Sequence, residues 1–344
     1  MKILFIFIAL LAGQATALAC PEIRLDKAGS LSSYPVFDQA NASAGTDMNI
    51  CYAATAAQLL DTYRASRAQQ EQLQNERTSP WWLAVNYSSS YKKDENSDVQ
   101  FGEPDKALET IKIDGVCSQA DLFGDQPTEE IIRFHQMVKE FYQSAGKNTE
   151  EKDAVLKLET LLQSLGFIKD STLLADISVK ALKEKTFVLF LRTLFQGKCQ
   201  GKVKQDPAFQ IERIDTERKG TPVEEKDKII METLQKSQPI EVSVCSQVLR
   251  TPDYDGSKGS KPRHFAKDCM RHSMLVIGSR TQKGECQYLV RDTYGSHSCT
   301  RTRNGQPWYH PSLECDGGQV WVPKEAVLKN IWGMTRISPE NSIQ

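Results

Sequence analysis

The spacing of apolar residues divides this chain of 344 residues into a helix-rich part up to about residue 235 and a strand-rich part beyond it. Over residues 127–235 apolar side chains recur at helical intervals. From Pro239 apolar residues alternate with Glu241 and Ser243, which predicts a strand. Further strands are predicted at residues 273–277, 287–291 and 319–322. This separation of helices from strands favours an α+β fold with two lobes.

Three helices are predicted upstream of this helical stretch. The first begins at or just before Cys51 and continues to about residue 76, with an alanine-rich face that allows close packing. A short helix over residues 81–87 carries two tryptophans that should anchor a core. A third helix is expected over residues 104–114, where Gly115 ends it.

The start of the chain has the pattern of an export signal. Met1-Lys2 precedes an apolar run over residues 3–12, and Ala17-Leu18-Ala19 supplies the small residues that a signal peptidase reads. The apolar run is too short to cross a bilayer, so residues 1–19 are predicted to be a removed signal peptide and no membrane span is expected. Cys20 becomes the first mature residue, where lipoproteins carry a lipid anchor. Ala17 favours simple export over that alternative, because lipoprotein signals usually have a larger aliphatic residue there.

Composition and charge exclude several classes of function. The chain is 40% hydrophobic and 25% charged, which is typical of a globular protein with a sizeable core. Its formal net charge is -1, so there is no electrostatic reason to expect nucleic acid or an anionic membrane surface as a partner. Cys269 with His264 and His272 lacks a second ligand pair for zinc, and we expect neither a metal nor a cofactor.

Export changes what the 9 cysteines imply. In an oxidising compartment all of them except Cys51 can form disulfides, and if they all pair, Cys51 is left as a free thiol. No pairing is predicted, although Cys286, Cys299 and Cys315 lie in one β-rich stretch where short bridges are feasible. The cysteines available for pairing are Cys20, Cys117, Cys199, Cys245, Cys269, Cys286, Cys299 and Cys315.

Cys51 lies at the start of a predicted helix. Such a position points backbone N–H groups and the positive end of the helix dipole at the sulfur, which favours the nucleophilic thiolate. A small buried side chain at a helix start is the alternative interpretation. A reactive cysteine also needs a base and a third group that orients the base.

His272 and Asp292 are the candidates for these two roles. His272 opens one predicted strand and Asp292 closes the next, so neighbouring strands of one sheet could bring imidazole and carboxylate within hydrogen-bonding reach. Taken singly, a histidine at a strand end and an aspartate in a turn are the alternatives.

Four short segments, in this order along the chain, resemble the signatures of papain-like cysteine peptidases. Members of that family carry a Gln before a Cys-Trp-Ala helix start, a His that opens a β-strand and an Asn-Ser-Trp-Gly turn. The matching segments are Pro35-Val36-Phe37-Asp38-Gln39, Cys51-Tyr52-Ala53, His272-Ser273-Met274-Leu275-Val276-Ile277-Gly278 and Tyr288-Leu289-Val290-Arg291-Asp292-Thr293-Tyr294-Gly295.

The resemblance implies a papain-like catalytic domain over residues 20–344. Its helical lobe is expected at about residues 45–235 and its β-rich lobe at about residues 20–44 and 236–335. Within the helical lobe, residues of about 127–230 form a stretch far longer than the corresponding family segment. We expect this stretch to be an insertion that narrows or covers the cleft.

The resemblance also implies a role for each matching residue. Cys51 is the nucleophile, His272 the general base and then acid, and Asp292 the group that orients the imidazole. Gln39 and the backbone N–H of Cys51 are the donors of an oxyanion hole.

This chain also departs from the family pattern at other points, among them Tyr52 and Tyr294 in place of Trp. Asp292 stands where the family has Asn, and a carboxylate would raise the pKa of His272 by its charge. Cys51 follows Gln39 by 12 positions, more than in the usual loop. Only about thirty mature residues precede Cys51, which leaves no room for a long inhibitory propeptide.

The sequence therefore predicts an exported cysteine peptidase that hydrolyses peptide bonds of a peptide or protein substrate through a thioester acyl-enzyme. A transglutaminase-like acyltransferase or amidase is one alternative, because the residue order is shared and an aspartate fits that chemistry. A papain-fold binding or structural protein without catalysis is the other. The substrate specificity and the oligomeric state stay open.

Overall fold

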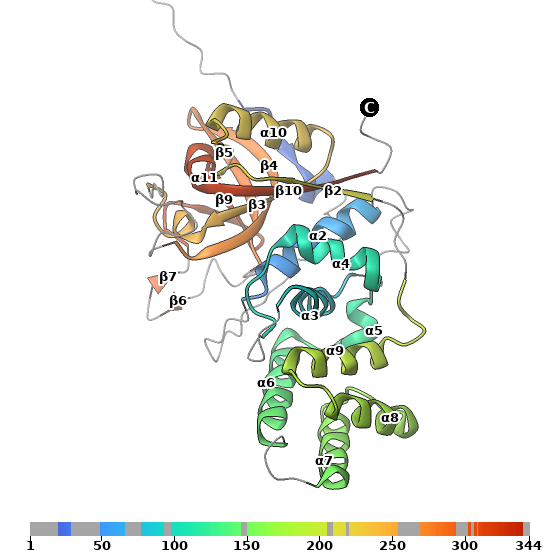
Figure 1. The fold of residues 1–344 in the computed structure, drawn as a ribbon. Coiled ribbons are helices and arrows are strands. Elements are labelled where there is room, and N and C mark those ends of the chain that lie inside the picture. Colours follow the sequence, from blue (N-terminus) through green and yellow to red (C-terminus); the bar gives the residue numbers. More distant parts are fainter. Residues whose placement is uncertain are drawn as a thin grey trace, which may run out of the picture.

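Within the described residues of the computed structural model, the chain combines one large antiparallel sheet with helices (Figure 1), which confirms the predicted α+β class. The described residues are 20–28, 49–65, 77–92, 98–145, 150–204, 209–217, 220–253, 269–293, 302–303, 306–307 and 309–339. The helices are α1 (Leu25–Ala28), α2 (Cys51–Ala65), α3 (Pro80–Tyr91), α4 (Pro104–Asp114), α5 (Gln119–Phe123), α6 (Thr128–Ala145), α7 (Glu151–Ser164), α8 (Ser171–Leu182), α9 (Phe187–Lys198), α10 (Val223–Gln235), α11 (Lys324–Asn330) and the 3₁₀ turn η2 (Ser246–Leu249). The strands are β1 (Ile23–Arg24), β2 (Phe209–Ile214), β3 (Ile240–Cys245), β4 (Arg271–Gln282), β5 (Glu285–Arg291), β6 (Thr302–Arg303), β7 (Gln306–Pro307), β8 (Glu314–Asp316), β9 (Gln319–Pro323) and β10 (Ile331–Pro339).

The sheet runs in the order β2-β10-β3-β4-β5-β9-β8, and β1 pairs with β4. All of these pairings are antiparallel, and β3, β4 and β5 lie at the centre. Helix α2 packs against β4, β3 and β10 on one side and against α3 and α4 on the other. The nucleophile candidate Cys51 therefore begins a helix that lies between the sheet and the other helices.

Local sequence signals explain where several elements begin and end. The hydroxyl of Ser79 accepts a hydrogen bond from the backbone of Trp82, and proline occupies the first position of α3, as is common at helix starts. Gly115 ends α4 with a positive φ of 64°. The helices predicted at residues 81–87 and 104–114 are confirmed as α3 and α4, and the four predicted strands as β3, β4, β5 and β9.

The helical pattern over residues 127–235 missed one strand. β2 pairs with β10 over its full length, and the next helix, α10, packs on β3 and β4. The helical interpretation is therefore wrong at β2, because a strand is fixed by a partner more than a hundred residues away rather than by local spacing. The division into lobes stays a prediction.

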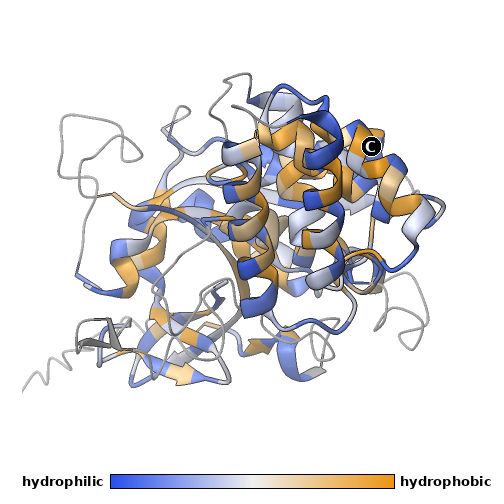
Figure 2. Ribbon diagram, turned by 90° about the horizontal axis from the view of Figure 1, so that it is seen from below, coloured by the Kyte–Doolittle hydropathy of each residue, from blue (hydrophilic) through white to orange (hydrophobic). Residues whose placement is uncertain are grey.

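Helices α6 to α9 form a group at the opposite end of the molecule from the sheet (Figure 1). Their apolar positions follow stripes along each helix (Figure 2), and aromatic rings fill the space between them. The ring centroids of Phe134 and Phe167 lie 4.5 Å apart, and Phe195 lies 6.3 Å from Phe134. A disulfide between Cys117 and Cys199 ties the end of α9 to the segment between α4 and α5.

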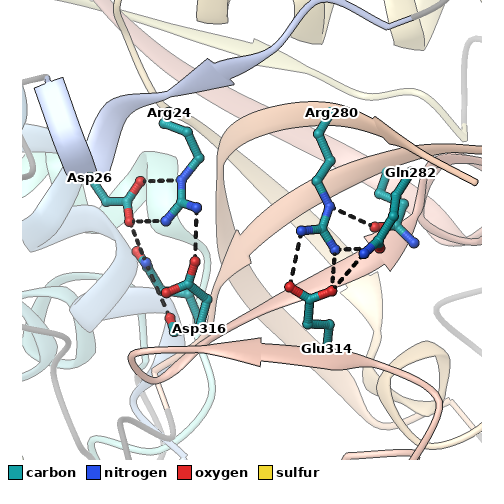
Figure 3. Close-up of polar contacts among 8 residues, drawn as sticks. Arg24, Asp26, Arg280, Gln282, Glu314 and Asp316 are labelled. Atoms are coloured by element: carbon teal, nitrogen blue, oxygen red, sulfur yellow. Dashed lines mark hydrogen bonds and ion pairs between the residues drawn. The ribbon is translucent and has the colours of Figure 1, made fainter.

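The first described residues, in β1 and α1, are attached to the sheet near its β8 edge. The guanidinium of Arg24 contacts Asp26 at 2.6 Å and Asp316 at 2.8 Å, and Arg280 contacts Glu314 at 2.7 Å (Figure 3). Both guanidinium groups lie over the ring of the buried Trp321, Arg280 at 4.0 Å from its centroid and Arg24 at 5.4 Å. These contacts join β1, α1 and β8 to β4 and β9.

A disulfide between Cys20 and Cys286 completes this attachment. It bears on two of the alternatives. A thioether-linked lipid anchor would need the sulfur of Cys20, which is bonded here to another cysteine. Cys286 forms no short bridge with Cys299 or Cys315, because its partner lies 266 residues away in the sequence.

The remaining cysteines agree with an oxidised protein. Cys245 is bonded to Cys269, which removes Cys269 from the zinc alternative, and Cys315 is disulfide-bonded as well. Cys299 lies outside the described residues. Among the described cysteines Cys51 is the one with a free thiol.

The polar residues of β3 are buried together with its apolar residues. All of β3 is buried, including Glu241, whose exposed fraction is 0%. One oxygen of Glu241 accepts hydrogen bonds from the hydroxyls of Ser243 at 2.6 Å and Ser273 at 3.0 Å. Burial raises the pKa of Glu241 to about 7 against the pull of these hydrogen bonds, so the folded protein favours the neutral carboxyl.

Glu241→Gln tests this assignment. The folded-state pKa lies above the unfolded value, so the stabilisation is complete in acid and is lost as the pH rises through about 7. Between about pH 5 and about pH 8 the wild type should lose roughly 3 kcal/mol of unfolding free energy relative to the variant, whose neutral amide does not titrate. Urea unfolding at the two pH values measures this difference. Glu325→Gln, at an exposed carboxylate, is the control, and equal pH dependence of Glu241→Gln and wild type would contradict the assignment.

Candidate active site

Cys51 is held at the first position of α2 by the burial of the helix behind it. Every residue of α2 after Cys51 is buried, while Cys51 itself is partly exposed. The hydroxyl of Thr55, one turn further on, donates to the backbone carbonyl of Ser273 at 3.1 Å and so fixes α2 against β4. The first N–H groups of a helix have no acceptor within it, so α2 directs them toward the Cys51 end.

The structure brings His272 and Asp292 together as predicted. His272 is the second residue of β4, and Asp292 follows directly after β5, the neighbouring strand. The imidazole Nε2 lies 2.5 Å from Asp292 Oδ1, and both side chains are buried. A carboxylate in this position holds the ring in one orientation and tautomer.

Cys51 lines the same cavity as His272 and is close enough to raise the pKa of the imidazole. Burial lowers the pKa of His272, but the charges of Asp292 and Cys51 and the hydrogen bond with Asp292 raise it. The net result lies well above the ordinary value. The arrangement therefore favours the protonated imidazole of His272.

Tyr309 is a site residue that the sequence did not reveal. Its hydroxyl donates to Asp292 Oδ2 at 3.0 Å, and only 3% of its surface is exposed. The only sequence signal is an aromatic residue in a turn-rich segment, and turns give no indication of which strand end they will meet.

A cavity of about 460 Å³ opens onto Cys51 and His272. It is lined by Cys51, Tyr52, Tyr87, Phe101, Gly102, Glu103, Pro104, Arg213, Asp215, Glu217, Ser243, Arg271, His272, Ser273 and Trp332. Within this wall Arg213 forms ion pairs with Glu103 and, at 3.0 Å, with Asp105. No described residue of α6 to α9 contributes to the lining. Arg213, Asp215 and Glu217, which lie in and just after β2 and within the stretch of about 127–230, do line it. The expectation that the insertion narrows or covers the cleft stays a prediction.

The rim of the cavity at residues 98–102 is joined to the turn that precedes Cys51. The backbone N–H of Phe101 donates to the carbonyl of Asn49 at 3.0 Å, and both residues have positive φ, 59° and 50°. The hydroxyl of Tyr52 donates to the carbonyl of Val99 at 2.7 Å. Strained backbone at both ends of this contact indicates that the surrounding packing fixes the rim beside the sulfur.

Helix α6 holds the outer side of the same rim. His135 Nε2 lies 3.2 Å from Asp98 Oδ1, and Lys139 Nζ lies 2.5 Å from Asp98 Oδ2. Burial raises the pKa of Asp98, but the contacts with His135 and Lys139 outweigh it and lower that pKa well below the ordinary value. Helix α6 therefore contacts the outer side of this rim through the partly buried side chain of Asp98.

Other predicted features are not tested by the structure. Gln39 lies outside the described residues, so its place in an oxyanion hole stays a prediction, and residues 1–19 and 294–295 lie outside them too. In the described part of the chain, no helix combines the length and apolar character needed to cross a bilayer. The same part contains no cluster of His, Cys, Asp and Glu side chains that could hold a metal ion.

Comparison with known proteins gives similarity only at the level of structure. No protein-family model and no curated protein sequence matches the chain. It is similar to SERA5E from Plasmodium falciparum at 12% identity, with 95% of this chain and 98% of that chain covered and a TM-score of 0.48. Procathepsin L 3 from the larval midgut of Tenebrio molitor gives 10% identity, 93% and 70% coverage and a TM-score of 0.43.

A third similar structure is xylellain, a cysteine protease from Xylella fastidiosa, at 10% identity, 94% and 88% coverage and a TM-score of 0.39. With identities this low and TM-scores below 0.5, these likenesses carry no argument about the activity or the residues of this chain.

Gly102→Ala tests the packing of the rim. A Cβ at this position lies 2.4 Å from the ring of Tyr52, which is buried and hydrogen-bonded and cannot move aside. We expect the substitution to lower the free energy of unfolding by about 1–3 kcal/mol. Gly333→Ala is the control, because its nearest neighbour would lie 3.7 Å away. Urea unfolding measures the free energy of unfolding of the two variants. Equal values would show that the rim rearranges to accommodate the added methyl group.

Proposed function

We propose that this protein is an exported, papain-like cysteine hydrolase that cleaves peptide bonds with a Cys51–His272–Asp292 triad. The observation that carries the proposal is the free thiol of Cys51 beside the imidazole of His272 in one cavity, with the buried carboxylate of Asp292 hydrogen-bonded to that imidazole. Nucleophile, base and orienting group in mutual contact are the parts that covalent acyl transfer requires.

In the proposed reaction the Cys51 thiolate attacks the carbonyl carbon of the scissile bond. The oxyanion that forms is stabilised by the backbone N–H of Cys51 at the start of α2, with Gln39 as the predicted second donor. His272 then gives its proton to the departing amine and leaves a thioester on Cys51. The imidazole next takes a proton from water, whose oxygen attacks the thioester and releases the acid product.

The lining of the cavity supports a polypeptide substrate. It is lined by acidic, basic and aromatic side chains, among them Glu217, Arg271 and Trp332. A pocket for one small apolar ligand has a mainly apolar wall with few polar groups. A mixed wall suits the varied side chains of an extended peptide.

The disulfides support export, because such bonds persist in oxidising compartments. Cys20 to Cys286 and Cys245 to Cys269 are both formed, and the thiol of Cys51 is left free for chemistry. The signal peptide over residues 1–19 remains the sequence-based part of this proposal.

Alkylation of Cys51 tests the proposal directly. Native protein treated with iodoacetamide should be labelled at Cys51 at least about tenfold faster than urea-denatured protein, because only the fold supplies the imidazolium. Cys51→Ala should abolish cleavage of a denatured, carboxymethylated protein substrate followed by mass spectrometry. Equal labelling of native and denatured protein would refute any enzymatic role. If the wild type incorporates amines but cleaves no peptide bond, and Cys51→Ala loses this incorporation, the acyltransferase alternative is favoured.

Substitution of Asp292 tests the third member. Asp292→Asn keeps an oxygen that can accept from His272 but loses the charge that raises the pKa of the imidazole. Since the imidazolium is then lost at lower pH, the alkaline limb of the activity profile should move to lower pH while activity near neutrality largely persists. Asp292→Ala also loses orientation and should fall by about 100-fold or more. Unchanged pH profiles in both variants would remove Asp292 from the triad.

A further inference from the structure

The carboxylate of Asp292 is a charged group in a fully buried place. Its exposed fraction is 0%, Oδ1 accepts from His272, and Oδ2 accepts from the hydroxyl of Tyr309 at 3.0 Å. A buried carboxylate stays ionised only when donors replace the water it has lost. The bond from Tyr309 is such a donor, and it comes from a segment outside the sheet that carries the triad.

Tyr309 is held in place by the same short turn that precedes the strand of His272. The backbone N–H of His310 donates to the carbonyl of Leu249 in η2 at 2.8 Å, which fixes the segment that carries Tyr309. The backbone N–H of Ser246, also in η2, donates to the carbonyl of Met270, next to β4, at 2.9 Å. One turn therefore positions both the start of the histidine strand and the hydroxyl that meets Asp292.

The disulfide between Cys245 and Cys269 closes the chain on both sides of this turn. Cys245 is the last residue of β3, directly before η2, and Cys269 lies two residues before β4. The bridge restrains η2 relative to β4 and leaves little freedom for the distance between His272 and Tyr309. These restraints fix the Tyr309 hydroxyl in the position from which it donates to Asp292, so we assign it more than a packing role.

The described charged and titratable groups around Asp292 come from four elements. His272 faces it from β4, with Cys51 of α2 beyond the imidazole, and Tyr309 faces it from the segment after β7. The neighbouring Arg291 on β5 donates to Gln319. His310 contacts Ser312 through its ring nitrogen. Within this set of groups, the side chains of His272 and Tyr309 form hydrogen bonds with the carboxylate.

We propose that Tyr309 is a positioning residue of the triad, whose hydroxyl keeps Asp292 ionised and fixed so that Asp292 can sustain the His272 imidazolium in acid. This inference rests on the proposed function. The hydroxyl donates to the charged form of the carboxyl, so its removal favours the protonated acid. A protonated Asp292 no longer stabilises the imidazolium, and the thiolate of Cys51 is lost with it.

Tyr309→Phe removes the hydroxyl and keeps the ring. The readout is the rate constant of Cys51 alkylation by iodoacetamide as a function of pH, which needs no knowledge of the natural substrate. Loss of a donor to the carboxylate should move the acid limb of this profile to higher pH by about one unit, the size expected for a charge-assisted hydrogen bond. At a pH on that limb the rate should therefore fall about tenfold, while the alkaline limb should not move to lower pH.

Two further variants separate positioning from a purely structural role. Tyr288→Phe, on β5, loses a partly buried hydroxyl-to-aspartate bond, to Asp227. It tests the loss of such a bond away from the triad, and it should leave both limbs where they are. In an Asp292→Asn background Tyr309→Phe should no longer shift the acid limb, because no carboxyl remains to titrate.

Each outcome bears on one proposal. If native wild-type Cys51 is alkylated no faster than denatured protein, the proposed function fails, and the role of Tyr309 fails with it. If the pH profile of Cys51 alkylation has an acid and an alkaline limb in the wild type, and both limbs lie at the same pH in Tyr309→Phe, the proposed function stands and the inference about Tyr309 is overturned. An equal acid-limb shift in Tyr288→Phe, or a persistent shift in the Asp292→Asn background, would also overturn it.

Discussion

The complete burial of helix α2 is the constraint on which the rest of the structure depends. A helix enclosed on all sides must carry small side chains where it meets a sheet and must satisfy each polar group that it takes inside. Ala53 and Ala56 are fully buried, and Asp61 accepts hydrogen bonds from the backbone and the hydroxyl of Thr78. Thr55 uses its hydroxyl to bind β4. A helix fixed in this way has one free end, and Cys51 occupies it.

The electrostatics of the site follow from the same burial. In a dry environment an imidazole on its own loses its proton more easily, so a histidine beside the sulfur needs a nearby negative charge to stay protonated. Asp292 supplies that charge at 2.5 Å, and its effect together with that of Cys51 outweighs the effect of burial. Burial thus adds a desolvation cost to forming the charged pair and strengthens the interaction once the pair has formed. The hydrogen-bond partners of the carboxylate therefore affect the protonation of His272 as much as the carboxylate itself does.

Long-range fastenings hold the two strand ends that meet at the site. Strand pairing fixes β4 against β5, but the turn η2, the disulfide between Cys245 and Cys269 and the segment of Tyr309 restrain the start of β4 from outside the sheet. On the other side of the cleft, Asp98 connects the rim to His135 of α6. The helices of the insertion are therefore mechanically linked to the cleft wall although they do not line it.

The sequence by itself determined the elements and the chemistry that depend on local pattern. Proline at the start of α3, glycine after α4 and the apolar strands β4, β5 and β9 are set by short-range sterics and spacing, and they were predicted. Cys51, His272 and Asp292 could be proposed together because each ends or begins a predicted element.

Only the tertiary structure decided what depends on contacts between distant segments. β2 forms only by pairing with β10, and Cys20 is bonded to the distant Cys286. In the buried strand β3, Glu241 accepts a hydrogen bond from Ser273 of β4. Tyr309 reaches Asp292 from a turn-rich segment that has no periodicity to predict its position. Spacing along a chain reports which face a residue shares with its neighbours, but burial and hydrogen bonding between remote segments arise only when the sheet closes around α2.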